Sequence, residues 1–476
     1  MKQIGSVAAL LLSVAILLAG SGLQGTLLPL RGQLENFSTV DIGVLGSAYF
    51  LGFAAGCLLG PALVRPVGHI RAFTALVSIA STTALGHALL PDAIVWWGLR
   101  AVTGFCFAAL YMIIESWLNE RATNENRGAI FSIYTIINLT VLTAGQMMIT
   151  LDTPASFVLF ALASILVSLA AVPVAMTTAP APAPIASVHI RVRHLYRISP
   201  VGFVGGLIVG LANGSFWSLG PLYAQAIGLN TTGIAIFMSA VVLAGAIGQW
   251  PFGYVSDRRD RRLVIIFGGT GAMAAAIALA LLPHDETLVV LGLAALFGCF
   301  AMPIYALSAA HMNDFVEPGG FVEAASGLLL VYAGGAVVGP MIASTLMRGI
   351  GPMGLFLFTA ASHALLVCFA IYRMTRRARA PEQDRVKFVD SLRVAQVVAA
   401  VDPLADTVEA APAQETSSDP AQPAKKPDLE NAEQRQQHHH ADESVTAVGG
   451  RHAAHVDAEQ TGDEAERQED SGDHRK

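Results

Sequence analysis

The sequence lacks most of the patterns that carry catalytic chemistry. It has no glycine-rich nucleotide loop, no cluster of metal ligands at a fixed spacing and no Ser/His/Asp arrangement. These absences argue against an ATP-driven pump and against a hydrolase embedded in lipid. The four cysteines all fall inside apolar runs, where they pack as small hydrophobic side chains and suggest no disulfide. We expect no enzymatic activity, no cofactor and no metal site.

Charged residues are also scarce. They make up 13% of the chain, and outside the C-terminal tail most of them lie in short breaks between long apolar runs. A helix needs roughly 20 apolar residues to cross the hydrocarbon core of a bilayer. Twelve runs approach or exceed that length: 5–30, 42–64, 72–90, 93–117, 129–150, 155–176, 201–224, 233–256, 263–282, 288–310, 324–347 and 354–373. The sequence predicts an all-α membrane protein with twelve transmembrane helices.

The second six runs repeat the first six. A shift of 192 residues, without a gap, places Pro29 on Pro221 and Gly56 on Gly248. One frame therefore holds across two runs and their connecting loop, which generic similarity between apolar segments explains less well. Parallel repeats of this kind build secondary transporters whose substrate site lies between the halves, near the bilayer midplane. We predict two pseudo-symmetric six-helix bundles.

The repeat and the composition divide the chain into four parts. They are an N-terminal bundle at 1–176, a cytoplasmic linker at 177–200, a C-terminal bundle at 201–375 and a cytoplasmic tail at 376–476. From residue 381 onward the chain carries 10 basic and 21 acidic residues, against 19 and 14 before it. A composition so rich in Ala, Glu, Asp, His and Pro cannot bury a core, so we expect a largely disordered tail whose histidines bind no metal. A short surface helix is expected at 386–401.

Lysine and arginine predict the orientation, because cytoplasmic loops retain them. With the N-terminus inside, the cytoplasmic side carries 16 basic residues and the other side only Arg31 and Arg348. We expect a multi-pass protein of a bacterial inner membrane with both termini in the cytoplasm. The expected partners are lipid, a small-molecule solute and protons. We expect a monomer that binds no nucleic acid.

The loop between the eighth and ninth runs holds the most informative motif. It reads Gly253-Tyr-Val-Ser-Asp257-Arg258 and continues into three further arginines. Gly253 permits close helix contact, and Asp257 can bind a helix N-terminus or a neighbouring arginine. Together with the repeat and its matching prolines, this motif resembles the loop signature of the major facilitator superfamily. The resemblance implies a carrier that works by alternating access.

The equivalent loop of the first half departs from that signature. Arg65 stands where the superfamily usually has an aspartate, while the turn at Gly68 and the basic residue Arg71 remain. Two other signatures agree with the resemblance. Arg100 and Gly104 in the fourth run match its Arg-then-Gly spacing.

The eleventh run carries the other signature, a Gly-x-x-x-Gly-Pro segment made of Gly335, Gly339 and Pro340. Small residues at this spacing allow close helix contact, and the proline permits bending, so we predict a hinge here.

Shorter segments resemble one branch of the superfamily more closely. The segments at 114–118, 126–128, 220–223 and 248–253 resemble those of the YcaD-like branch, and the resemblance extends over 1–375. It implies a proton-coupled or facilitative carrier and names no substrate.

Gate contacts follow from the same resemblance. It implies that Asp257 meets Arg127 and the start of the fifth helix. It also brings Arg65 and Arg71 toward the 310–323 loop and Glu323, so that the first-half gate keeps its latch with the charges exchanged. The alternative is that these charges only face water and obey the topology rule, since exposed ion pairs contribute about 0–1 kcal/mol.

Ionisable residues inside a membrane are costly and are functional candidates. Arg100 is a candidate to bind an anionic solute group or to tune a nearby proton carrier. The alternative is a structural arginine bonded to backbone carbonyls of neighbouring helices. Glu115 on the same run is a candidate proton carrier, because burial raises the pKa of a carboxyl group. Its alternative is an interfacial anchor or a partner of Arg127.

The first, fourth, seventh and tenth helices usually line the cavity in the superfamily. The candidate lining residues, besides Arg100, are Gln24, Tyr111, Asn138, Asn213, Trp217 and Tyr305. Tyr223 is expected to be a membrane-interface anchor. With few acidic groups, this lining predicts an amphipathic or anionic organic solute. The rival interpretation is a membrane sensor or scaffold that docks partners through its charged tail.

Overall fold

The structure is a computed structural model that describes residues 7–123, 126–177, 191–317, 320–376 and Phe388. These residues form helices joined by short turns. The helices are α2 (Ala8–Leu34), α3 (Thr39–Val67), α4 (His69–Leu89), α5 (Ala93–Arg121), α6 (Arg127–Met147), the 3₁₀ turn η1 (Met148–Leu151), α7 (Phe157–Leu169), α8 (Ala171–Ala175), α9 (Val192–Ile198), α10 (Pro200–Ala226), α11 (Thr231–Arg258), α12 (Arg261–Leu281), α13 (Thr287–Ala301), α14 (Pro303–Asn313), α15 (Phe321–Ile350) and α16 (Met353–Met374).

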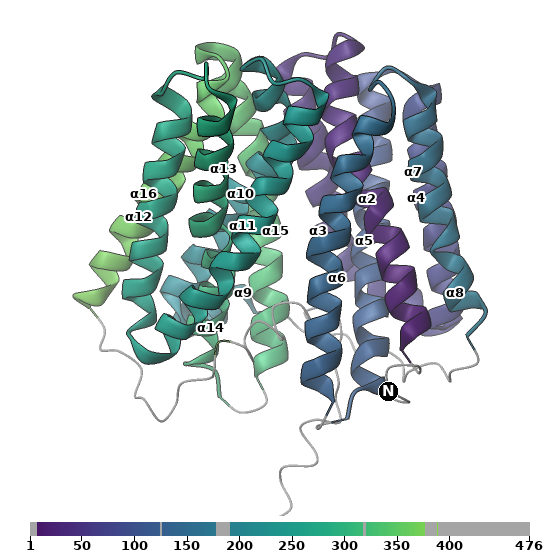
Figure 1. The fold of residues 1–476 in the computed structure, drawn as a ribbon. Helices are drawn as coiled ribbons and strands as arrows, with labels where there is room; N and C mark the ends of the chain where they lie inside the picture. Colours follow the sequence, from purple (N-terminus) through teal and green to yellow (C-terminus); the bar gives the residue numbers. More distant parts are fainter. Residues whose placement is uncertain (1–6, 124–125, 178–190, 318–319, 377–387, 389–476) are drawn as a thin grey trace, which may run out of the picture. The chain divides into compact units, whose positions relative to one another are not determined.

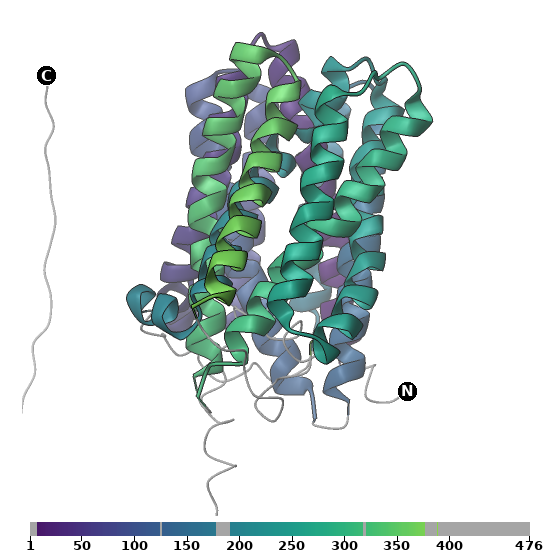
Figure 2. The same ribbon diagram turned by 90° about the vertical axis from the view of Figure 1, so that its left-hand side faces the viewer.

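Twelve segments of the described chain are long and apolar enough to cross a membrane. Helix α7 with α8, and α13 with α14, each make one such segment. Figures 1 and 2 show the long helices running along a common direction, with α9 short and at one end. The predicted all-α fold with twelve spans is confirmed.

The helix boundaries repeat in the frame found in the sequence. A shift of 192 residues places both ends of α2 on those of α10 and both ends of α4 on those of α12. The same shift places the start of α3 on the start of α11. The two halves differ at Pro303, where the long helix equivalent to α5 is divided into α13 and α14. A proline removes one backbone donor and clashes with the preceding turn, which explains the break.

Matching side chains start the matching helices. Ser38 caps α3: its Oγ accepts from the backbone N–H of Asp41 at 3.2 Å, and the Asp41 carboxylate accepts from the backbone N–H of Ser38 at 2.9 Å. Asn230 stands at the equivalent position and accepts from the N–H of Gly233 at 2.8 Å. Ser38 and Asp41 therefore form a capping box. The negative charge of Asp41 also interacts favourably with the dipole at the start of α3.

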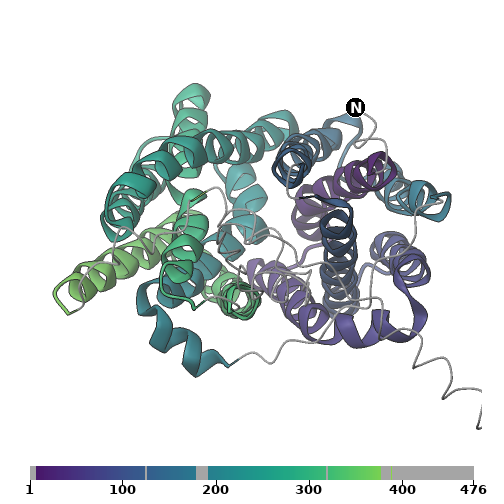
Figure 3. The same ribbon diagram turned by 90° about the horizontal axis from the view of Figure 1, so that it is seen from below.

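Helix packing separates the chain into two groups. Extensive contacts join α3 to α5 and α2 to α6, and likewise α10 to α15 and α12 to α16. Between the groups, α15 and α10 pack on α3, and α11 packs on α6 and η1. Figure 3 shows the helices of both groups nearly end-on. We call the end that carries Arg65 and Arg258 the basic end.

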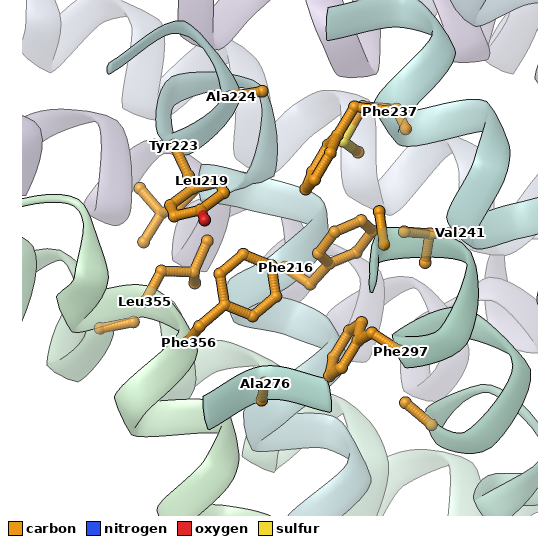
Figure 4. Packing of buried hydrophobic residues seen from close by; sticks show 14 of the residues in the cluster. Phe216, Leu219, Tyr223, Ala224, Phe237, Val241, Ala276, Phe297, Leu355 and Phe356 are labelled. Atoms are coloured by element: carbon orange, nitrogen blue, oxygen red, sulfur yellow. The ribbon is translucent and has the colours of Figure 1, made fainter. Parts of the chain in front are cut away.

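An aromatic cluster fills the second group. Phe216, Tyr223, Phe237, Phe297 and Phe356 meet edge to face or tilted, with ring centroids 4.6 Å apart for Tyr223 and Phe356. The Tyr223 hydroxyl donates to the carbonyl of Leu279 at 2.6 Å (Figure 4 shows the cluster). The prediction that Tyr223 anchors the membrane interface is wrong: its side chain is fully buried, because the cluster gives its ring apolar partners and Leu279 satisfies its hydroxyl.

The predicted linker and tail lie mostly outside the described residues. Residues 178–190 and all residues after 376 except Phe388 are not described. The predicted disorder of the tail, its surface helix and its lack of a metal site therefore stay predictions.

Candidate functional site: a cavity between the two halves

A cavity of about 230 Å³ lies between the two groups of helices. Its walls come from α2, α3, α5 and α6 on one side and from α10, α11 and α15 on the other. Most lining residues are small or apolar. The charged, amide and aromatic ones are Tyr49, Phe50, Arg100, Tyr111, Gln146, Trp217 and Tyr332.

Arg100 is the charged residue of this lining. Its guanidinium carbon lies 4.4 Å from the centroid of the Tyr49 ring, within the range of a cation–π interaction. No carboxylate lines the cavity, and in the described chain Arg100 forms no ion pair. In the lining of the cavity, the positive charge of Arg100 therefore contacts the ring of Tyr49 and no negative charge.

Glycines place Arg100 and Tyr49 next to each other. A methyl group at Gly104 would collide with the carbonyl oxygen of Tyr49, and one at Gly52 with the carbonyl of Ala101. Helices α3 and α5 thus touch backbone to backbone, as small residues allow in membranes. This contact brings the Tyr49 ring under the arginine one turn earlier on α5.

Aromatic rings form the rest of the wall. Phe50 of the first half and Tyr332 of the second meet edge to face with centroids 6.5 Å apart. Tyr305 packs on Tyr332 at 5.2 Å, behind the lining. Trp217 and Tyr111 line the cavity directly. The cavity thus combines one cation with several π faces, a lining that suits an anion attached to an apolar or planar body.

Some of the residues predicted to line the cavity do so, and others do not. Arg100, Tyr111 and Trp217 line it, whereas Gln24, Asn138, Asn213 and Tyr305 do not. The Asn138 amide donates to the carbonyl of Tyr134 at 2.9 Å, a bond within its own helix.

Two buried amides lack ordinary partners. Gln24 is 2% exposed, and neither of its amide atoms is hydrogen-bonded within the described residues. Asn213 reaches only the Met302 sulfur, at 4.0 Å, and its oxygen is likewise unpaired there. Each unpaired buried group costs roughly 1–3 kcal/mol.

Four lining residues were not predicted from the sequence: Tyr49, Phe50, Gln146 and Tyr332. Gln146 is 3% exposed and its amide oxygen has no partner in the described chain, as with Gln24. An amide inside an apolar run was the signal that could have found it. Tyr49 and Tyr332 had no such signal, because membrane tyrosines are common at interfaces.

Glu115 lies apart from the cavity. It is 7% exposed and its Oε1 accepts from the Tyr134 hydroxyl at 3.1 Å. It stands 15 residues beyond Arg100 on α5, or about 22 Å along the helix. Tyr111 lies one turn before Glu115 and lines the cavity, so it is the side chain between the two.

The predicted gate residues lie at the basic end. Glu323 pairs with Arg191 through two contacts of 3.1 and 3.2 Å. Arg65 and Arg71 form no ion pair within the part of the chain that the structure describes. The latch between these two arginines and Glu323 is therefore unformed in this conformation.

A charge network surrounds the second-half motif. Arg261 and Asp314 form a buried pair at 2.7 Å, and Asp257 lies 3.4 Å from Arg261. Arg258 stacks on Tyr254 at 3.6 Å. The Arg127 side chain is outside the described part, so its predicted contact with Asp257 stays a prediction.

Asp260 caps α12 in the same network. Its carboxylate accepts from Arg262 at 2.7 Å and from the Arg262 backbone N–H at 3.0 Å. Burial raises the pKa of Asp260, but these hydrogen bonds outweigh burial and hold the pKa below its usual value.

The predicted hinge is a continuous helix here. Helix α15 runs unbroken through Pro340. Methyl groups at Gly335 and Gly339 would collide with the carbonyl oxygens of Leu207 and Leu211. These glycines therefore let α15 lie directly on α10, and bending at this point stays a prediction.

The halves touch at the end opposite the basic end. A methyl group at Gly43 would collide with the Ser344 side chain, and one at Gly46 with that of Ser218. Both glycines lie in the first turns of α3, whereas Arg65 lies in its last turn. The described contacts thus bring the two halves together at the end of the cavity opposite Arg65.

Comparison with known proteins agrees with this architecture. The family model described as Major Facilitator Superfamily matches residues 10–332 and 202–411. The chain belongs to the major facilitator superfamily. It is 29% identical over 364 residues to an uncharacterized MFS-type transporter of Enterobacter sp. (strain 638), covering 74% of this chain and 91% of that protein. It is 28% identical over 364 residues to the uncharacterized MFS-type transporter YcaD of Escherichia coli O6:K15:H31, covering 74% and 90%. These similarities support the YcaD-like branch.

Solved structures of superfamily members share the fold. The nucleoside transporter NupG superposes with a TM-score of 0.67 at 12% identity, covering 78% of this chain and 99% of that one. A bacterial homologue of the human lysosomal transporter Spinster, inward-facing and occupied, gives 0.65 at 16%, covering 80% and 97%. A D-xylose–proton symporter gives 0.62 at 14%, covering 80% and 99%. This chain is a multi-pass bacterial membrane transporter of the same fold.

Proposed function

We propose that this protein is a secondary active transporter that moves a small organic solute across the inner membrane by alternating access. The observation that carries the proposal is the cavity, whose walls come from both halves of a repeated fold. A site at such a boundary is exposed to either side in turn when the halves rock against each other.

The proposed orientation places the basic end in the cytoplasm, because basic residues mark cytoplasmic loops. In this orientation the contacts of Gly43 and Gly46 close the periplasmic side. Arg65 and Arg71, which form no ion pair with any residue the structure describes, then face the cytoplasm, and the proposed conformation is inward-facing. The predicted N-terminal bundle, which ends at residue 176, and the predicted C-terminal bundle, which starts at residue 201, are then the two parts that move.

The proposed solute is an organic anion with an apolar or aromatic body. Arg100 supplies the positive charge, and no carboxylate in the lining competes for it. Tyr49, Phe50 and Trp217 supply the surfaces for the body. The cavity volume of about 230 Å³ limits the solute to the size of a small metabolite.

Proton coupling is proposed at Glu115. A buried carboxyl whose oxygen accepts from Tyr134 can bind and release a proton as its surroundings change between conformations. Tyr111 connects its region of α5 with the cavity, which gives a route for solute occupancy to affect the proton site.

The test is uptake into proteoliposomes. Wild type, Arg100→Ala and the control Arg348→Ala, at the end of α15 and outside the lining, are screened with neutral, cationic and anionic solutes under an imposed pH gradient. We expect uptake of an anion by wild type and the control, and at least about tenfold slower uptake by Arg100→Ala. No transport of any solute by folded protein would overturn the proposal and favour a sensor or scaffold. Transport that ignores Arg100 would overturn the proposed site.

A further inference from the structure

Phe388 is held against α11 by two contacts of different kinds. Its side chain is 2% exposed, and a methyl group at Gly253 would collide with its ring. Its backbone N–H donates to a carboxylate oxygen of Asp257 at 2.8 Å. The missing side chain of Gly253 thus makes the space for the ring, and Asp257 fixes the backbone one turn further along.

Helix α11, which contacts Phe388, lies at the boundary between the two halves. Helix α11 is the one that packs on α6 and η1 of the first half, and Met238 near its start lines the cavity. Gly253 lies about four turns further along the helix and roughly 60° round from Met238. Gly253 and Asp257 therefore lie at the basic end of a helix that the two halves share as a boundary.

Under the proposed alternating access, closure of the basic end would use this same face. When the halves rock, the last turns of α11 approach the first turns of α6. Gly253 then offers a close backbone approach, and Asp257 offers a carboxylate for the N–H groups at the start of α6. Phe388 occupies both features in the present conformation, in which Arg65 and Arg71 form no ion pair with a described residue.

We propose that the docking face, made of Gly253 and Asp257, binds the chain's own C-terminal segment through Phe388, in competition with the first half. The bound segment holds the basic end open, and its release permits closure. This inference rests on the proposed alternating access and adds a control by the tail.

The test measures closure directly. Spin labels are attached at Val67→Cys in α3 and at Val192→Cys in α9, the linker helix that packs on α10 and α15, in full-length protein whose four native cysteines are replaced by serine. Both positions are 44% exposed and lie near the basic end. Wild type is compared with Phe388→Ala and with the control Phe369→Ala on α16. We expect the short-distance population to grow roughly fivefold in Phe388→Ala and to stay unchanged in the control. Equal populations in wild type and Phe388→Ala would overturn the inference.

Two truncations cover the case in which Phe388→Ala folds poorly. A chain ending at residue 400 keeps Phe388 and should behave like wild type, whereas one ending at 376 should close like Phe388→Ala. If both truncations match wild type, the docking inference fails while alternating access stands. If no variant closes under any solute or pH, the alternating-access proposal fails and the inference fails with it.

Discussion

The guanidinium of Arg100 lies over the ring of Tyr49, 4.4 Å from its centroid, inside a cavity that both halves of the protein enclose. The two residues come from α5 and α3, which touch backbone to backbone at Gly52 and Gly104. The aromatic face stabilises the cation without neutralising it, so its charge stays available to a solute anion.

This relationship predicts different effects for two changes at Tyr49. Tyr49→Leu removes the π face and lets Arg100 move, so the affinity for the transported anion should fall about fivefold. Tyr49→Phe keeps the ring and should stay within about twofold of wild type. The apparent KM of uptake measures both. Equal losses in the two variants would show that the hydroxyl, and not the ring, is the important group.

Glu115 is predicted to couple transport to protons. Glu115→Gln keeps the contact with Tyr134 and removes the titration. Uptake driven by a pH gradient should be lost, while exchange of solute across proteoliposomes without a gradient should continue. A variant that still concentrates solute on a pH gradient would demote Glu115 to a structural role.

The gate makes a charge-reversal prediction. Arg65→Glu and Glu323→Arg should each slow transport, because each places like charges at the closing end. The double variant should recover most of the rate if Arg65 and Glu323 form the latch. Arg191 supplies the control, since it already pairs with Glu323 at 3.1 Å. Rescue of Glu323→Arg by Arg191→Glu, and not by Arg65→Glu, would assign the pair to the linker instead of the gate.

The buried pair of Arg261 and Asp314 should dominate stability at the basic end. Their side chains are 2% and 3% exposed, so Asp314→Asn removes the shorter of the two carboxylate contacts of the buried Arg261 and leaves it the more distant Asp257, at 3.4 Å. Breaking such a pair costs roughly 3–5 kcal/mol. The pair of Arg191 and Glu323 should contribute little, because the Arg191 side chain is exposed and water screens the interaction. In detergent, the unfolding temperature should therefore fall strongly for Asp314→Asn and only slightly for Glu323→Gln.

The sequence predicted the fold well because membrane helices follow from local rules. Twelve apolar runs gave twelve spans, and the frame that aligned Pro29 with Pro221 also aligned the helix ends. Ser38 and Asn230 show why: equivalent capping residues start equivalent helices.

The site was predicted only in part, because a sequence does not give helix rotation. Arg100 was found since an arginine inside a membrane is rare. Gln24 and Asn213 were equally unusual, but the packing turns them away from the cavity. Tyr49 and Tyr332 were missed because the neighbours that aim them come from distant helices. The contact of Phe388 could not be predicted from the sequence, because its ring fills a space that the missing side chain of the distant Gly253 provides.

The measurement that tests alternating access most directly is the accessibility of one cavity position from both sides of the membrane. Ser21 lines the cavity, and Ser21→Cys, with the native cysteines replaced by serine, adds a thiol of similar size there. A membrane-impermeant thiol reagent is applied to vesicles of either orientation, with Thr123→Cys at the basic end as a one-sided control. With alternating access, the thiol at position 21 should react from both sides and the control thiol from one. Reaction at position 21 from a single side, in protein that transports solute, would contradict alternating access of this cavity.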